Sequence, residues 1–154
     1  MTTGTDLVSR SREETEALGE RIGRAASAGD VVALWGELGA GKTALARGIA
    51  RGLGHGDGLV TSPTFVILHE HLEGRLPFFH LDLYRIAPSD AEGTGWREAV
   101  EGGGVAAIEW PDRVADDLPE DRLDVRIEHA GADERHIRLE PTGPRSAVLA
   151  RTAA

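Results

Sequence analysis

Apolar and polar positions alternate along this chain in two different periods, and together they predict an α/β protein. Between residues 11 and 28 apolar side chains recur at helical spacing, which predicts a helix. Ser11 stands at the expected N-cap with Glu14 three residues on, the pattern of a capping box. The next segment, Val31 to Trp35, is continuously apolar, which is typical of a strand buried on both faces.

The rest of the chain extends this pattern with two hairpins and further helices. Helices are expected at residues 43–53 and 90–100, although Gly93 and Gly95 count against the second. Polar turns join two pairs of strand-like segments into hairpins, and one buried strand lies between the hairpins. These strand-like segments are residues 65–71 and 76–83, residues 105–110, and residues 122–128 and 136–140. From Pro141 onward the chain is small, polar and proline-containing, so we expect a single domain over residues 1–140 and a tail over 141–154.

Composition narrows the class of protein. With 154 residues, 40% of them apolar, the chain is expected to fold around one core without disulfides, and it contains no cysteine. No apolar run reaches membrane-spanning length and the first residues do not resemble a secretory signal, so we expect a cytoplasmic protein that uses no membrane. The net charge of −9 argues against independent, tight RNA binding, because phosphate neutralisation supplies most of such affinity.

A glycine-rich loop after the first buried strand carries the strongest chemical signal. Gly36 to Thr43 fits G-x-x-x-x-G-K-[ST] and stands between a predicted strand and a predicted helix. In such a loop backbone N–H groups surround the β-phosphate, the lysine bridges β- and γ-phosphates, and the hydroxyl is a magnesium ligand. The loop predicts a P-loop NTPase: a three-layer α/β fold with a mixed, mostly parallel central sheet and antiparallel hairpin additions. The nucleotide-binding residues it predicts are Gly36, Glu37, Leu38, Gly39, Ala40, Gly41, Lys42 and Thr43.

The choice of nucleotide follows from lysine usage. Lys42 is the only lysine among 17 basic residues, and the element by which P-loop GTPases read guanine needs a second lysine. ATP with Mg²⁺ is therefore the expected ligand pair. Magnesium also needs a carboxylate near the end of a neighbouring strand, and two strand-like runs end in acids, at Asp82 and at Glu109. Glu109 ends the more completely apolar run and is favoured, so the predicted catalytic residues are Lys42, Asp82 and Glu109.

Two other groups of side chains allow more than one interpretation. His69, His71 and His80 fall on alternate positions of the first hairpin and invite a zinc site, but neutral histidines on a hairpin are far commoner. Trp110 follows Glu109 directly, and its ring either walls the site against water or belongs to the core.

Four separated motifs also resemble a known family. The loop at 36–43 is followed in order by Ser62-Pro63-Thr64-Phe65, by residues 80–85 (His-Leu-Asp-Leu-Tyr-Arg) and by residues 108–111 (Ile-Glu-Trp-Pro). Over residues 11–140 the chain closely resembles the bacterial TsaE (YjeE) family. Members are small ATPases required for threonylcarbamoyl modification of adenosine in tRNAs, and they work with TsaB and TsaD. The resemblance implies that TsaD transfers the carbamoyl group, while the TsaE-like protein hydrolyses ATP to reset the complex and meets tRNA only indirectly.

The resemblance also implies roles for individual residues. It assigns magnesium to Thr43 and Glu109, with Asp82 as a further acid close to the metal or the attacking water. Ser62, Pro63 and Thr64 would form a switch-like segment near the γ-phosphate, although this run is also a common turn sequence. Ser11, Thr15 and Arg135 would flank the adenine pocket by analogy.

Two alternative functions stay open at this stage. A small-molecule P-loop kinase would need an arginine-bearing lid and an acceptor region, and no arginine-dense lid is evident in the sequence. An ATP-gated adaptor without catalysis would bind the nucleotide and not consume it. ATP consumption with and without partners separates the adaptor from the ATPase, and a search for phosphorylated metabolites tests the kinase.

Overall fold

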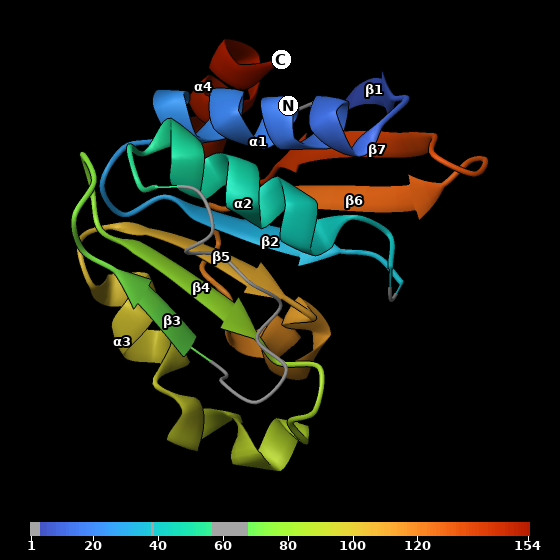
Figure 1. Ribbon diagram of the computed structural model, residues 1–154. Coiled ribbons are helices and arrows are strands. Elements are labelled where there is room, and N and C mark those ends of the chain that lie inside the picture. The colour runs from blue at the N-terminus through green and yellow to red at the C-terminus, as the bar shows by residue number, and fades with distance from the viewer. Residues whose placement is uncertain (1–3, 38, 57–67) are drawn as a thin grey trace.

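A single mixed sheet with helices on both faces organises the chain (Figure 1). The computed structural model describes residues 4–37, 39–56 and 68–154. Within these residues the sheet has seven strands, in the order β1-β7-β6-β2-β5-β4-β3. Their bounds are β1 Thr5–Ser9, β2 Val31–Trp35, β3 Leu68–His71, β4 Phe78–Asp82, β5 Val105–Glu109, β6 Leu123–His129 and β7 Arg135–Pro141.

The middle of the sheet is parallel and its two edges are antiparallel. β6, β2, β5 and β4 run parallel to one another, whereas the β3–β4 and β6–β7 hairpins and the β1–β7 pair are antiparallel. The mixed sheet and both hairpins agree with the sequence prediction. Because the parallel strands end at the same edge, the residues that follow β2, β4 and β5 come together there.

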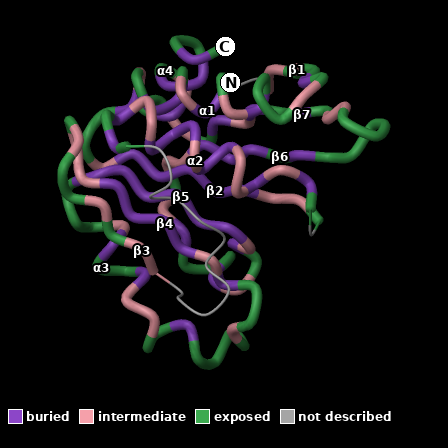
Figure 2. The backbone as a smooth tube through the Cα atoms, in the orientation of Figure 1, coloured by how far each residue is buried: buried purple, intermediate pink, exposed green. Residues whose placement is uncertain are grey.

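Helices cover the sheet on two faces. α1 (Arg12–Ala25), α2 (Lys42–Gly52) and α4 (Pro144–Ala153) pack on one face, where Ile22, Ile49 and Leu149 join the larger core cluster. The 3₁₀ helices η1 (Pro88–Thr94) and η2 (Pro111–Asp117) and the short α3 (Trp96–Glu101) lie on the other face around Trp96 and Ile108. The central strands β2, β4 and β5 are the most buried part of the sheet (Figure 2).

The contact between α1 and α2 is unusually close because both helices meet at glycines. A Cβ built on Gly48 of α2 would lie 2.1 Å from the carbonyl oxygen of Glu16 in α1. A Cβ built on Gly19 of α1 would lie 2.2 Å from the carbonyl oxygen of Leu45 in α2. Gly23 and Gly52 repeat the arrangement one turn further along. Backbone therefore packs directly on backbone, as in small-residue helix contacts elsewhere.

Three local differences separate the structure from the sequence prediction. The segment after Pro141, predicted to be a tail, instead forms α4, whose Leu149, Ala150 and Ala153 are buried in the larger core. The predicted helix at 90–100 is divided at Gly95, which has a φ of 83°. The edge strand β1 was not predicted. None of the described helices is long and apolar enough to cross a membrane.

Candidate functional site

The glycine-rich loop occupies the place that its sequence predicts, between the end of β2 and the start of α2. Gly39 and Gly41 have φ values of 79° and 113°, which side-chain-bearing residues rarely adopt. Gly36 is required for a different reason, since a Cβ there would lie 2.7 Å from the carbonyl oxygen of Ile127. Leu38 lies outside the described residues. The loop can thus turn tightly against β6 and lead directly into the N-terminus of α2, a position that favours a bound phosphate.

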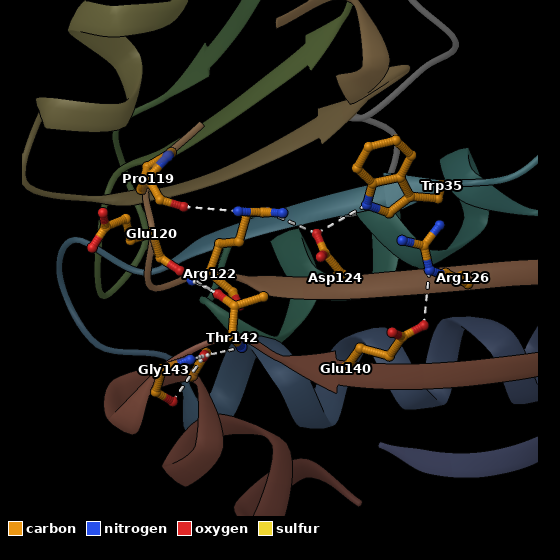
Figure 3. A network of polar contacts seen from close by, with 10 residues as sticks. Trp35, Pro119, Glu120, Arg122, Asp124, Arg126, Glu140, Thr142 and Gly143 are labelled. Atoms are coloured by element: carbon orange, nitrogen blue, oxygen red, sulfur yellow. Dashed lines mark hydrogen bonds and ion pairs between the residues drawn. The ribbon is translucent and has the colours of Figure 1, made fainter. Parts of the chain in front are cut away.

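Both ends of this loop are tied to the β6–β7 hairpin. Figure 3 shows Trp35, the residue before the loop, donating from its indole nitrogen to Asp124 of β6 at 2.9 Å. Asp124 is buried and also accepts from Arg122 Nε at 2.9 Å. On the other side of the loop, Arg135 of β7 donates from Nε to the carbonyl oxygen of Ala40 at 2.9 Å. These two hydrogen bonds therefore hold the glycine-rich loop against the β6–β7 hairpin of the sheet.

Lys42 is the first residue of α2 and lies buried beside the loop. Its Nζ donates to the carbonyl oxygens of Gly36 and Glu37, and it sits 3.6 Å from the centroid of the Trp110 ring. Burial lowers the pKa of the Lys42 ammonium below its usual value, while nearby Glu109, Asp82 and Asp112 oppose that shift. The single ammonium of this site is thus held by carbonyl dipoles, an aromatic face and carboxylates.

Thr43 and Glu109 meet at the ends of α2 and β5. The Thr43 hydroxyl lies 3.4 Å from Glu109 Oε1 and 3.3 Å from Oε2, and Glu109 is buried. These are the two side chains predicted to share a magnesium ion. The pair fits Mg²⁺, which typically takes one or two carboxylates and completes its shell with phosphate and water oxygens. Within the part of the chain described by the structure, no cluster of three or more His, Cys, Asp or Glu residues could hold a metal.

Asp82 lies next to this pair at the end of β4. The backbone register places Asp82 opposite Glu109 of β5. Asp82 is partly exposed, and its Oδ1 accepts from the backbone N–H of Tyr84 at 3.0 Å. Burial raises the pKa of the Asp82 carboxyl above its usual value, and the Tyr84 N–H partly offsets this. The structure therefore brings Lys42, Asp82 and Glu109 to one edge of the sheet.

Trp110 borders the candidate site in a backbone conformation that is rare for an aromatic residue. Its φ of 58° and ψ of 53° make it the one described residue other than glycine with a positive φ. This conformation costs about 1–3 kcal/mol and is found where a side chain must be aimed in a fixed direction. The ring meets Lys42 on its face and the Tyr84 ring edge-on, with centroids 4.8 Å apart. Trp110 is also partly buried and packs against the second core cluster, so both interpretations of its ring stay open.

The remaining predicted residues have separate positions. Thr15 is buried, its hydroxyl lies 2.7 Å from that of Ser9, and its methyl group is 3.8 Å from the Cβ position of Gly41. Ser11 caps α1 by accepting from the N–H of Glu14 at 3.1 Å. Arg135 contacts the loop backbone, as described above. Thr15 and Arg135 thus border the loop, whereas Ser11 acts at the helix start, and adenine contact by any of the three stays a prediction.

The proposed switch, Ser62, Pro63 and Thr64, lies outside the described residues, so its role also stays a prediction. Sequence reasoning gave no role in this site to His80. The structure shows His80 Nε2 at 2.6 Å from Glu109 Oε2, with the His80 side chain fully buried. The available signal was the position of His80 two residues before Asp82 on the same strand. That spacing places the side chains of His80 and Asp82 on one face of the sheet, the face of the candidate acids.

Comparisons with known proteins agree on one family. The family model described as "Threonylcarbamoyl adenosine biosynthesis protein TsaE" matches residues 9–137. The chain is 42% identical over 137 residues to the tRNA threonylcarbamoyladenosine biosynthesis protein TsaE of Bacillus subtilis (strain 168), covering 89% of this chain and 85% of that protein. It is also 42% identical to TsaE of Treponema pallidum (strain Nichols) over 131 residues, covering 84% and 96% of the two chains. The crystal structure of Bacillus subtilis YdiB superposes with a TM-score of 0.84 at 35% identity, over 99% of this chain and 95% of that one.

Proposed function

The chain belongs to the family of the threonylcarbamoyl adenosine biosynthesis protein TsaE, and from this premise we propose that it binds and hydrolyses ATP with Mg²⁺. In this proposal the hydrolysis serves threonylcarbamoyl modification of adenosine in tRNA, together with TsaB and TsaD. The B. subtilis and T. pallidum relatives carry tRNA threonylcarbamoyladenosine biosynthesis in their names.

One observation carries the ATPase proposal: Thr43 and Glu109 touch, directly beside the Lys42 ammonium. The Thr43 hydroxyl is 3.3 Å from Glu109 Oε2, and Glu109 is one of three carboxylates that act electrostatically on Lys42. A hydroxyl at the start of α2 paired with the acid of a neighbouring parallel strand is the arrangement by which P-loop proteins hold magnesium. Thr43 and Glu109 lie 66 positions apart in the sequence, and the fold brings them into contact where this chemistry requires both.

Each side chain then has a defined task. Lys42 gives up its bonds to Gly36 and Glu37 and neutralises β- and γ-phosphate oxygens, and Trp110 keeps bulk water from its other side. Thr43 and Glu109 would hold the metal, and the metal would neutralise phosphate charge. Asp82 orients the attacking water, because it is the partly exposed acid of the group. Since the carboxylates of Glu109 and Asp82 face the one lysine of the site, free ATP is repelled and we expect binding to depend on magnesium.

The proposed partners, TsaB and TsaD, are those that the family resemblance implies. A net charge of −9 disfavours unaided binding to a polyanion, so contact with tRNA is assigned to the complex with TsaB and TsaD. Hydrolysis acts on that complex only if the ATP and ADP states bind it with different affinity.

The test is a reconstituted assay of tRNA modification over several turnovers, run with parallel measurement of ATP consumption. We expect the wild-type chain to support repeated modification and to consume ATP faster when TsaB and TsaD are present. Lys42→Ala is the matched negative control. Modification that proceeds equally well without the chain would refute the tRNA role, and binding of ATP without consumption under all conditions would make the chain an adaptor.

A further inference from the structure

A buried histidine on β4 contacts the acid that is assigned to magnesium. His80 has no exposed surface, and its Nε2 lies 2.6 Å from Oε2 of Glu109. An ionised carboxylate only accepts hydrogen bonds, so the Nε2–H tautomer of His80 is the one that donates to Oε2. The His80–Glu109 contact is shorter than either contact between Thr43 and Glu109.

We propose that His80 is a positioning residue that fixes the carboxylate of Glu109 for the metal. The hydrogen bond engages Oε2, while the Thr43 hydroxyl lies within reach of both carboxylate oxygens, 3.4 Å from Oε1 and 3.3 Å from Oε2. Outer partners of metal-binding carboxylates restrict rotation of the ligand in this way, and their loss typically lowers metal affinity about 10- to 100-fold. This inference rests on the proposed function and adds to it the residue that orients the magnesium acid.

The sheet holds the His80 ring in place. In the register of β4 and β5, His80 lies opposite Ala107, two residues before Glu109, so its ring and the Glu109 side chain share one face. The ring is stacked on Phe78 of its own strand, with centroids 6.2 Å apart, and lies 6.4 Å from the His69 ring of β3. His80 Nδ1 is buried without a hydrogen-bond partner among the described residues. Among the described residues, the only polar contact of the His80 ring is therefore the one with Glu109.

Three substitutions separate the donated hydrogen bond from the packing of the ring. His80→Leu removes the donor and keeps the bulk. His80→Gln returns an amide N–H at the reach of Nε2, whereas His80→Asn reaches only as far as Nδ1. His71→Leu is the matched control, because His71 lies on the same hairpin, has a buried Nε2 without a described partner, and makes no described contact with Glu109.

The experiment measures ADP binding by calorimetry, once with excess EDTA and once across a magnesium titration. We expect His80→Leu and His80→Asn to raise the magnesium concentration needed for half-maximal ADP binding about 10- to 100-fold. Their ADP affinity in EDTA should be unchanged. His80→Gln should retain most of the magnesium affinity, and His71→Leu should match wild type. The difference in thermal midpoint between Mg-ADP and ADP in EDTA gives a second readout that does not require turnover.

Two outcomes would overturn the inference. One is a His80→Leu or His80→Asn variant that binds magnesium as wild type does. The other is equal loss in the Gln and Asn variants, because the position of the donor would then not matter. Wild-type protein that shows no magnesium-dependent nucleotide binding is a separate result, and it would refute the proposed function itself.

Discussion

Gly48→Ala is expected to destabilise the protein, although alanine is the better helix former. The new methyl carbon would lie 2.1 Å from the Glu16 carbonyl oxygen, whereas ordinary van der Waals contact begins at 3.4 Å, an overlap of 1.3 Å. The methyl group meets backbone, which cannot rotate away, so α1 and α2 must move apart. A separation of 0.5–1 Å already forfeits about a quarter to a half of the dispersion energy of each affected contact.

The cost of overpacking at Gly48 exceeds the gain in helix propensity, so the net effect on stability is a loss. Overpacking of a close contact costs typically about 1–3 kcal/mol, and this overlap belongs at the upper end. The gain in helix propensity offsets about 1 kcal/mol. We therefore expect a net loss of about 2 kcal/mol in the free energy of unfolding, or about 4–8 °C in Tm for a domain of this size.

The assay is equilibrium unfolding in urea followed by circular dichroism, with Gly93→Ala as the matched control. Gly93 is exposed and a Cβ there would meet no atom within 4 Å, so this control should lie within about 0.5 kcal/mol of wild type. Gly19→Ala should also destabilise, and the double variant with Gly48→Ala should cost less than the sum, because the helices are already separated. A Gly48→Ala protein as stable as wild type would refute the assumption that this helix contact is rigid.

Three further predictions concern the site. Lys42→Ala should abolish ATP consumption in a coupled assay, because the γ-phosphate loses its counter-cation, and wild-type turnover in this variant would exclude the loop as the phosphate site. Glu109→Gln should raise the magnesium concentration needed for half-maximal nucleotide binding, and titrations that overlay wild type would make Asp82 the main metal acid. The raised pKa of Asp82 means that the folded protein binds the proton more tightly than the unfolded chain does, so its contribution to stability is present at low pH and is lost as pH rises through the folded-state pKa. Asp82→Asn should therefore gain stability relative to wild type between acid and neutral pH, and a difference in unfolding free energy that is constant with pH would contradict this.

Much of the site could be predicted because it depends on local patterns. Val31 to Trp35 is a purely apolar run, so the strand and the loop after it were recognisable from sequence. That Lys42, Asp82 and Glu109 lie together followed from placing acids at the carboxyl ends of parallel strands. The positioning contact of His80 depends on the register between β4 and β5, which one sequence does not reveal.

The elements that were missed have weak or misleading patterns. β1 is a five-residue edge strand whose apolar residues, Leu7 and Val8, are adjacent instead of alternating. α4 is built largely from small residues, so its composition suggested a tail. Its signals were Pro144 at the first helical turn and the spacing of Leu149, Ala150 and Ala153. These residues form a helix because α1 offers them a surface to cover, and that is a tertiary effect.

The pairing of β1 with β7 has a consequence for how this chain folds as it is made. Thr5 lies opposite Leu139, 134 positions later in the chain (139 − 5). At synthesis rates of about 5–20 residues per second, β1 waits on the order of 10 s for its only described neighbour in the sheet. Contacts that close so long a loop form late, because the entropy of closure must be overcome first. A nascent chain halted before β7 would leave one edge of the sheet open and prone to pairing with other chains.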